Sequence, residues 1–228
     1  MELTDQPSLP PDTNPNTTLQ VDFTWRKFKA YVTAVSAPSK PLYIVDYKCL
    51  KKECIVVTSG DSSAQIGTGT LHVFSINPNY RLHGRKGTIK ALSRWKTSYT
   101  HLSHAYASSP DGPPATMTWT SDSDFKTWDF ICLDEHQMPV ARFKANLWAL
   151  KKIGYIEFLG DRATSEAARD EIVVTGLTLM YCMILRTTSL LSFFGAIFAR
   201  PGPIKDGTAA HDGVPAAQTR QALAGKQD

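Results

Sequence analysis

The residues best suited to chemistry in this chain are basic side chains within a long stretch that has no acids. No Asp or Glu occurs between Ser62 and Pro110, although the 228-residue chain has 21 of them, and Tyr and Trp residues are interleaved with the basic ones. Near an anionic membrane each Lys or Arg contributes about 1 kcal/mol of attraction, and aromatic rings favour the membrane interface. We therefore expect this stretch to bind anionic membrane lipid, and the candidate residues are Arg81, Arg85, Lys86, Lys90, Arg94 and Lys96.

The alternative is that these cations form a solvated face and pair with acids from elsewhere in the chain. Side chains alternate between the two faces of a strand, so a basic run on a strand is divided between them, and charge runs are often only solvated surface. Nucleic acid is the other polyanion to consider. The net charge is only +4 and no helix-turn-helix, zinc-finger or RNA-recognition signature is present, so we predict no nucleic-acid binding.

The polar residues that most resemble catalytic or metal-binding groups fit neither role well. His101 and His104 are three residues apart, which points them to opposite faces of a strand. The sequence Asp134-Glu135-His136 is typical of a solvated turn. The four cysteines form no C-x-x-C pair, and the Walker A, Rossmann and nucleophile-elbow motifs are missing. We predict no enzymatic activity, catalytic residue, metal, cofactor or small-molecule substrate.

The segment from Ile172 to Leu185 is predicted to be a buried helix, and the strands of the chain must enclose it. From Ile172 to Leu185 no charge occurs, and the apolar residues do not keep to one stripe. A helix that is apolar all round is buried in a protein or in a membrane, and this one is shorter than the roughly 20 residues of a membrane span. Thr164 or Ser165 can cap its start, which predicts a core helix over about 165–186 inside a closed barrel.

A rival interpretation joins this helix to the apolar residues that follow it. Residues 172–199 contain one charge, Arg186, and would be long enough to cross a bilayer with tilt, which predicts a tail-anchored protein. An arginine at that depth costs about 2.5–3.5 kcal/mol, so we favour the barrel. The second half of this segment has its own candidates for membrane contact on one helical face, unless that face packs on the barrel: Phe193, Phe194, Ile197 and Phe198.

The rest of the chain is predicted to be short β-strands between two tails. Residues 1–20 and 201–228 are poor in bulky apolar groups and are expected to be disordered, which leaves residues 21–200 as one domain. The start of the chain has no signal-peptide pattern, so we expect a cytoplasmic protein. The predicted strands cover residues 42–47, 54–58, 66–76, 88–92, 98–107, 115–120, 127–133, 139–143 and 154–159.

Several motifs in these segments resemble the tubby C-terminal-like superfamily, which includes LURP-one-related proteins and phospholipid scramblases, and most closely a fungal branch of uncharacterised tubby-like proteins. The resemblance covers roughly residues 40–190. The motifs that carry it are Leu42–Tyr47 (LYIVDY), Gly67–His72 (GTGTLH), Leu82–Arg85 (LHGR), Thr127–Glu135 (TWDFICLDE), Pro139–Phe143 (PVARF), Gly154–Gly160 (GYIEFLG) and Asp170–Thr178 (DEIVVTGLT).

The resemblance implies a closed antiparallel β-barrel of about a dozen strands around one central apolar C-terminal helix. It also implies phosphoinositide binding, which tubby proteins achieve with a Lys and an Arg in a short outer-surface motif. That motif has no residue-by-residue counterpart here, since Arg94-Trp95-Lys96 has the residue types in reversed order, and a scramblase-like calcium segment is missing. We predict a non-enzymatic, peripheral lipid-binding barrel, with a protein-interaction scaffold of unknown partner as the alternative.

Overall fold

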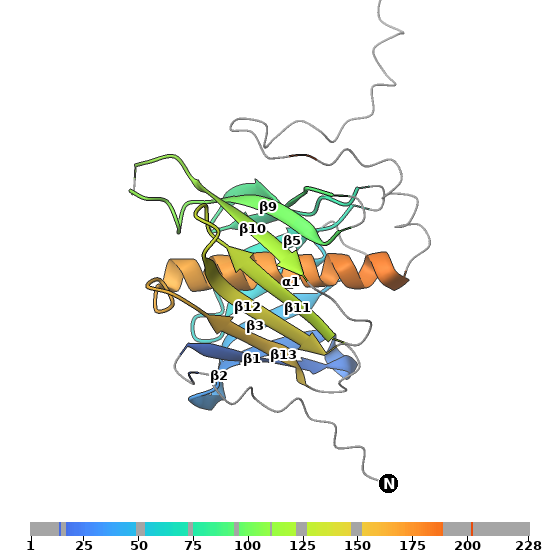
Figure 1. Ribbon diagram of the computed structural model, residues 1–228. Helices are drawn as coiled ribbons and strands as arrows, with labels where there is room; N and C mark the ends of the chain where they lie inside the picture. The colour runs from blue at the N-terminus through green and yellow to red at the C-terminus, as the bar shows by residue number, and fades with distance from the viewer. Residues whose placement is uncertain are drawn as a thin grey trace, which may run out of the picture.

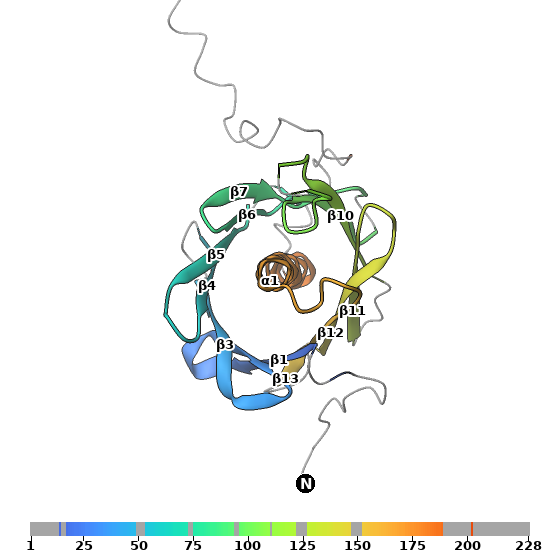
Figure 2. The same ribbon diagram turned by 90° about the vertical axis from the view of Figure 1, so that its left-hand side faces the viewer.

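The computed structural model describes residues 14, 17–48, 53–72, 75–93, 96–109, 111–121, 127–146, 152–188 and 202. Thirteen strands form one antiparallel sheet in the order β7-β6-β5-β4-β3-β2-β1-β13-β12-β11-β10-β9-β8. The sheet curls into a nearly closed barrel, and a single long helix lies along its axis (Figures 1 and 2). The predicted fold class, a mainly β barrel with a C-terminal helix at its centre, is confirmed.

The strands follow one another around the ring. Consecutive strands pair with each other except β7 and β8, and the one pairing between described strands far apart in the chain joins β1 to β13. Their bounds are β1 Thr18–Thr24, β2 Lys29–Ala34, β3 Ala37–Tyr47, β4 Ile55–Ser59, β5 Gln65–Thr70, β6 Asn79–Leu82, β7 Arg85–Thr88, β8 Lys90–Ala91, β9 Ser98–Ser103, β10 Ala115–Ser121, β11 Thr127–Leu133, β12 Pro139–Asn146 and β13 Lys152–Phe158.

Closure of the barrel depends on one continuous segment that belongs to both edges of the sheet. Strand β7 pairs with β6, whereas β8, only one residue further along the chain, pairs with β9. The intervening Ile89 is fully buried, and its backbone N–H donates to the Pro78 carbonyl at 2.8 Å. The N–H of Ala91 donates to the Asn77 side chain at 2.9 Å. The chain therefore passes from one edge to the other here, which leaves little exposed sheet edge.

Helix α1, Glu166–Thr188, fills the barrel. It begins where the sequence predicts, because the Ser165 hydroxyl accepts from the N–H of Ala168 at 3.4 Å. Every residue from Asp170 to Met180 is buried, so no face of this part of the helix meets water. Residues 172–180 are thus enclosed by the barrel. Within the described residues, no helix has the length and apolar character needed to cross a membrane.

Two glycines of β5 bring the barrel wall close to the helix. A Cβ atom at Gly67 would lie 2.8 Å from the Val174 side chain, and one at Gly69 would lie 2.5 Å from the Thr178 hydroxyl. Val174 and Thr178 are four residues apart and therefore share one face of the helix. The sequence suggests bulges or bends at these glycines. A register irregularity does lie beside Gly67, between Val57 and Thr58 of β4, but the close approach of the helix is the stronger requirement.

Replacing Gly69 with alanine is expected to lower the free energy of unfolding by about 1–3 kcal/mol, because the added methyl group overlaps Thr178 in a packed interior. A second change, Thr178→Ala, removes the overlapping atoms and should restore part of the loss. Urea denaturation of both variants measures this coupling, with Thr70→Ala, at the neighbouring half-buried position, as the control. Equal stabilities for Gly69→Ala with and without Thr178→Ala would contradict the packing described.

The sequence missed two strands at the start of the barrel, β1 and β2, and two in the middle, β6 and β7. β1 begins at Thr18, so the last three residues of the predicted tail 1–20 belong to the barrel. Strands β2, β6 and β7 also lack a predicted counterpart, and the predicted strand 66–76 ends at Thr70. In β1 the apolar residues Leu19, Val21 and Phe23 do alternate with polar ones, but the run directly follows a polar, proline-rich segment that hides it. The remaining predicted tail residues, apart from 14, 17 and 202, lie outside the described residues.

Candidate functional site

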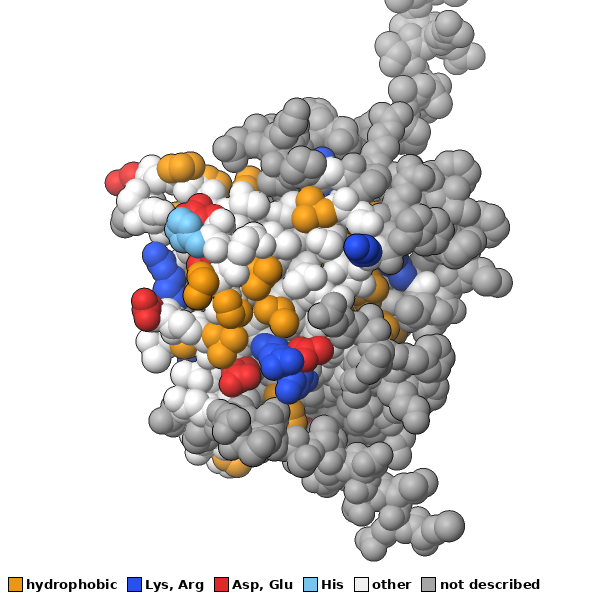
Figure 3. Space-filling view, in the orientation of Figure 1, with side chains coloured by type: hydrophobic (Ala, Val, Ile, Leu, Met, Phe, Trp, Pro, Cys, Tyr) orange, Lys and Arg blue, Asp and Glu red, His pale blue; other side chains and the backbone are white. Residues whose placement is uncertain are grey.

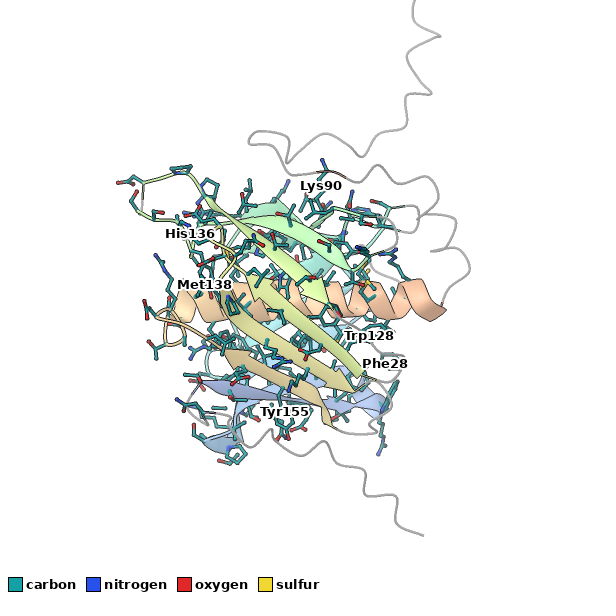
Figure 4. All side chains as sticks on the ribbon, in the orientation of Figure 1. Phe28, Lys90, Trp128, His136, Met138 and Tyr155 are labelled. Atoms are coloured by element: carbon teal, nitrogen blue, oxygen red, sulfur yellow. The ribbon has the colours of Figure 1, made fainter. Side chains whose placement is uncertain are left out.

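Three of the six predicted lipid-binding residues lie together on the outside of the barrel. Arg81 of β6 is directly opposite Lys86 of β7, and Lys90 follows on β8. The alternating positions Tyr80, Ile89 and Ala91 are buried, so these cations point outward. Figure 4 shows Lys90 pointing away from the barrel. We call Arg81, Lys86 and Lys90 the basic strip.

The other three candidates do not join this strip. Arg85 is opposite Leu82, beside the β6–β7 turn, so strand alternation separates it from Lys86. Lys96 is exposed in the β8–β9 connection at the other end of these strands, and Arg94 lies outside the described residues. Within the described part of the chain, Lys86 and Lys90 form no ion pair, whereas Arg81 lies 3.7 Å from the Glu53 carboxylate. The apolar candidates Phe193, Phe194, Ile197 and Phe198 also lie outside the described residues.

A second set of polar side chains, which the sequence did not identify, surrounds the start of α1. The Asp170 carboxylate accepts from the Tyr43 hydroxyl at 2.5 Å and contacts the His83 ring nitrogen Nε2 at 2.9 Å. Arg169 donates to the same Tyr43 hydroxyl at 3.1 Å. Burial, followed by the neighbouring Asp170 carboxylate, raises the pKa of Tyr43. Asp170 therefore joins the helix start to β3 and to the β6–β7 turn.

The next residue makes a fully buried pair. Glu171 is 3% exposed and its carboxylate lies 3.1 Å from Nε2 of His101, which is 0% exposed. The ring of Tyr80 packs edge-on against His101, with ring centroids 6.0 Å apart. Burial, and next the Glu171 charge, raises the pKa of Tyr80. The pair is shut off from solvent and joins α1 to β9.

A shallow hollow of about 90 Å³ opens beside this cluster. Pockets for drug-sized ligands occupy about 300–1,000 Å³, so the hollow is too small for one. One of its acids, Asp61, is paired with Lys40 at 2.9 Å. The hollow is lined by Leu42, Tyr43, Ser59, Asp61, Ile66, Glu166, Arg169 and Asp170.

The other polar groups weighed in the sequence lie in the β11–β12 turn and in or directly after β9. The Asp134 carboxylate accepts from the backbone N–H groups of His136 at 2.9 Å and Met138 at 2.8 Å, which makes Asp134–Met138 an exposed turn, as the sequence predicts. Acidic and histidine side chains gather at this end of the barrel (Figure 3), where Figure 4 labels His136. His101 is buried whereas His104 is exposed. Among the described residues, no three His, Cys, Asp or Glu side chains gather as a metal ion would require.

No protein-family model matches this chain, and comparison with curated proteins and with solved structures gave no match. The assignment to the tubby C-terminal-like superfamily therefore stays a prediction that rests on the sequence motifs.

Proposed function

We propose that this protein is a non-enzymatic, cytoplasmic barrel that binds anionic lipid headgroups at a membrane surface, with the basic strip as its contact. The observation that carries the proposal is the placement of Arg81, Lys86 and Lys90 on one outer face of β6–β8. The surrounding stretch from Ser62 to Pro110 contributes no acid of its own. Side chains alternate between the two faces of these strands, and three of the six candidate cations still share the outer face. Three cations are enough to attract a negatively charged surface.

The barrel interior is filled, which favours a ligand site on the outer surface of the barrel. In a barrel that holds a ligand, the central space is left open. Here α1 occupies it, and Gly176 of the helix lies against the ring of Trp119, where an added Cβ would be 3.2 Å from that ring. Trp119 and Phe143 of the wall are both fully buried. A ligand is therefore expected at the surface and not within the barrel.

The strength of such a contact can be estimated from its charges. Three basic residues at about 1 kcal/mol each give about 3 kcal/mol of attraction, which corresponds to weak and reversible association. Arg81 contributes less where Glu53 neutralises it. Exposed charges are screened over a Debye length of about 8 Å at physiological ionic strength. We therefore expect binding that depends on anionic lipid and weakens as salt is added.

Co-sedimentation of the full chain with vesicles tests the proposal, comparing neutral phosphatidylcholine with vesicles that also contain phosphatidylserine or a phosphoinositide. The double variant Lys86→Gln/Lys90→Gln is expected to bind the anionic vesicles about thirtyfold more weakly, since two cations contribute about 2 kcal/mol. The matched control Lys40→Gln/Lys144→Gln removes the same charge elsewhere and should bind nearly as well as the natural chain.

Equal loss of binding in the two variants would mean that net charge, and not the strip, controls the association. A folded natural chain that does not bind anionic vesicles would contradict the proposal. Capture of a protein partner without lipid would then favour the scaffold alternative.

A further inference from the structure

A short connection between β1 and β2 exposes two large aromatic rings. It is a 3-10 turn, η1 Trp25–Lys27, followed by Phe28. The structure describes four large hydrophobic residues as exposed, and two of them are here, Trp25 at 56% and Phe28 at 46%. Exposed aromatic rings this close together are unfavourable in water and indicate a contact surface. We call Trp25–Phe28 the aromatic tip.

The rings of the tip are held firmly in place. Phe23 packs edge-on against Trp25, Phe28 and Tyr47, with centroid separations of 4.8, 6.0 and 5.6 Å. Tyr47 in turn packs on Tyr181 of α1 at 5.1 Å. A column of rings therefore connects the exposed tip to the helix inside the barrel, which pre-organises the tip for binding.

The backbone of the tip is also unusual. Phe28 has a φ of 50°, in the left-handed region that residues other than glycine seldom adopt. Its N–H donates to the Trp25 carbonyl at 3.3 Å, and its own carbonyl accepts from Tyr47 N–H at 3.0 Å. Strained residues of this kind often mark functional positions. Here the conformation keeps Phe28 beside Trp25 at the surface.

The charges of the tip indicate what it contacts. Arg26 and Lys27 lie between the two rings and are exposed, and neither forms an ion pair with another described residue. Aromatic rings flanking cations match the boundary between the headgroups and acyl chains of an anionic bilayer, where rings enter the apolar side and cations meet phosphate. A protein partner with a hydrophobic patch would not by itself require the two cations.

The described strand connections at the two ends of the barrel differ in charge, which favours one orientation. The tip belongs to the end where α1 finishes, and the described strand connections there contain four cations and one acid, namely Arg26, Lys27, Lys48, Lys96 and Glu53. The described connections at the other end contain one cation and five acids, namely Arg162, Asp61, Asp111, Asp134, Glu135 and Asp161. Acidic side chains are visible at that far end in Figure 3, whereas Figure 4 shows Phe28 toward the end where α1 finishes.

We propose that the aromatic tip is a membrane anchor: Trp25 and Phe28 insert into the interfacial region of an anionic bilayer, with Arg26 and Lys27 on its phosphates. This inference rests on the proposed lipid binding and adds the orientation. β1 and β7 lie on opposite sides of the ring in Figure 2. The aromatic tip and the basic strip can therefore contact the same flat membrane only if the end of the barrel where α1 finishes faces that membrane. Lys90, exposed Leu92 and Lys96 then approach the same surface.

Vesicle binding by the full chain tests the anchor. Trp25→Ser/Phe28→Ser is expected to weaken binding to phosphatidylserine vesicles about tenfold or more, because it removes two rings that would be buried in the interface. The matched control is Met138→Ser, which removes a residue that is 60% exposed at the opposite end of the barrel. It should bind as the natural chain does. Circular dichroism and thermal melting establish that each variant is folded.

A second readout does not depend on affinity. Vesicles containing brominated phosphatidylserine should quench part of the tryptophan fluorescence of the natural chain. In Trp25→Phe, which keeps an aromatic ring at the tip, binding should persist while this quenched component disappears. Undiminished quenching in Trp25→Phe would overturn the anchor.

The outcomes of these experiments distinguish the proposal of lipid binding from the proposal of the membrane anchor. If the natural chain ignores anionic vesicles, lipid binding itself fails. If Lys86→Gln/Lys90→Gln loses binding while folded Trp25→Ser/Phe28→Ser binds normally, lipid binding stands and the anchor is wrong. The anchor is also wrong if the tip variant loses only the capture of a protein while its lipid binding is unchanged.

Discussion

Replacing His101 with leucine is expected to lower the free energy of unfolding by about 3–5 kcal/mol, because it leaves the Glu171 carboxylate buried without its partner. Leucine is similar in size to histidine, so the variant should leave little cavity. The lower free energy of unfolding would then come mainly from the unpaired Glu171 carboxylate. Glu171 directly precedes the uncharged part of α1, which begins at Ile172. The change should therefore weaken the attachment of the helix to β9. Urea denaturation at neutral pH measures it.

The double variant His101→Leu/Glu171→Leu separates charge from packing. When both members of a buried ion pair become apolar, the result is often neutral or stabilising. The double variant is therefore expected to be more stable than His101→Leu alone. A His101→Leu protein as stable as the natural one would show that the pair is not an anchor. Losses that simply add in the double variant would show that the two side chains are not coupled.

Raising the pH above about 10 is expected to unfold the protein cooperatively, since tyrosine ordinarily ionises there. Burial is the largest cause of a raised pKa at each of five tyrosines: Tyr43, Tyr47, Tyr80, Tyr99 and Tyr106. These groups lose protons in the unfolded chain before they do in the folded one. Stability is complete below the unfolded pKa and falls as pH rises through it, by about 1.4 kcal/mol per pH unit for each tyrosine. Burial also raises the pKa of Cys182 to about 12, which acts in the same direction.

Tyrosinate absorbance and far-ultraviolet circular dichroism, followed together against pH, test this expectation and should change in one shared transition. Tyr47→Phe is the informative variant, because the buried Tyr47 hydroxyl has no hydrogen-bond partner among the described residues. Its transition should move to higher pH. Tyr31→Phe, at a half-buried position of β2, is the control. Tyrosine ionisation that is complete before the dichroism changes would contradict the burial of these hydroxyl groups.

The candidate site was only partly predictable because strand alternation divides neighbouring residues. The basic run was visible in the sequence, and its separation by alternation was foreseen in general. Which cations share a face depends on the register of β6 against β7, which places Arg81 opposite Lys86 and Leu82 opposite Arg85. The aromatic tip gave a weaker signal. No local pattern marks Trp25 and Phe28 as surface residues, and only the turn between β1 and β2 exposes them.

The sequence by itself determined the central helix and most of the barrel wall. Fourteen uncharged, mostly apolar residues without a stripe can be satisfied only by burial on all sides, and period-two patterns identify strands locally. The tertiary structure alone decided which polar groups meet. His101 and Glu171 are 70 residues apart, and His83 and Asp170 are 87 apart. Their pairing depends on how far α1 slides along the barrel axis, which is set by the fit of Val174 and Thr178 against Gly67 and Gly69 and by no local pattern.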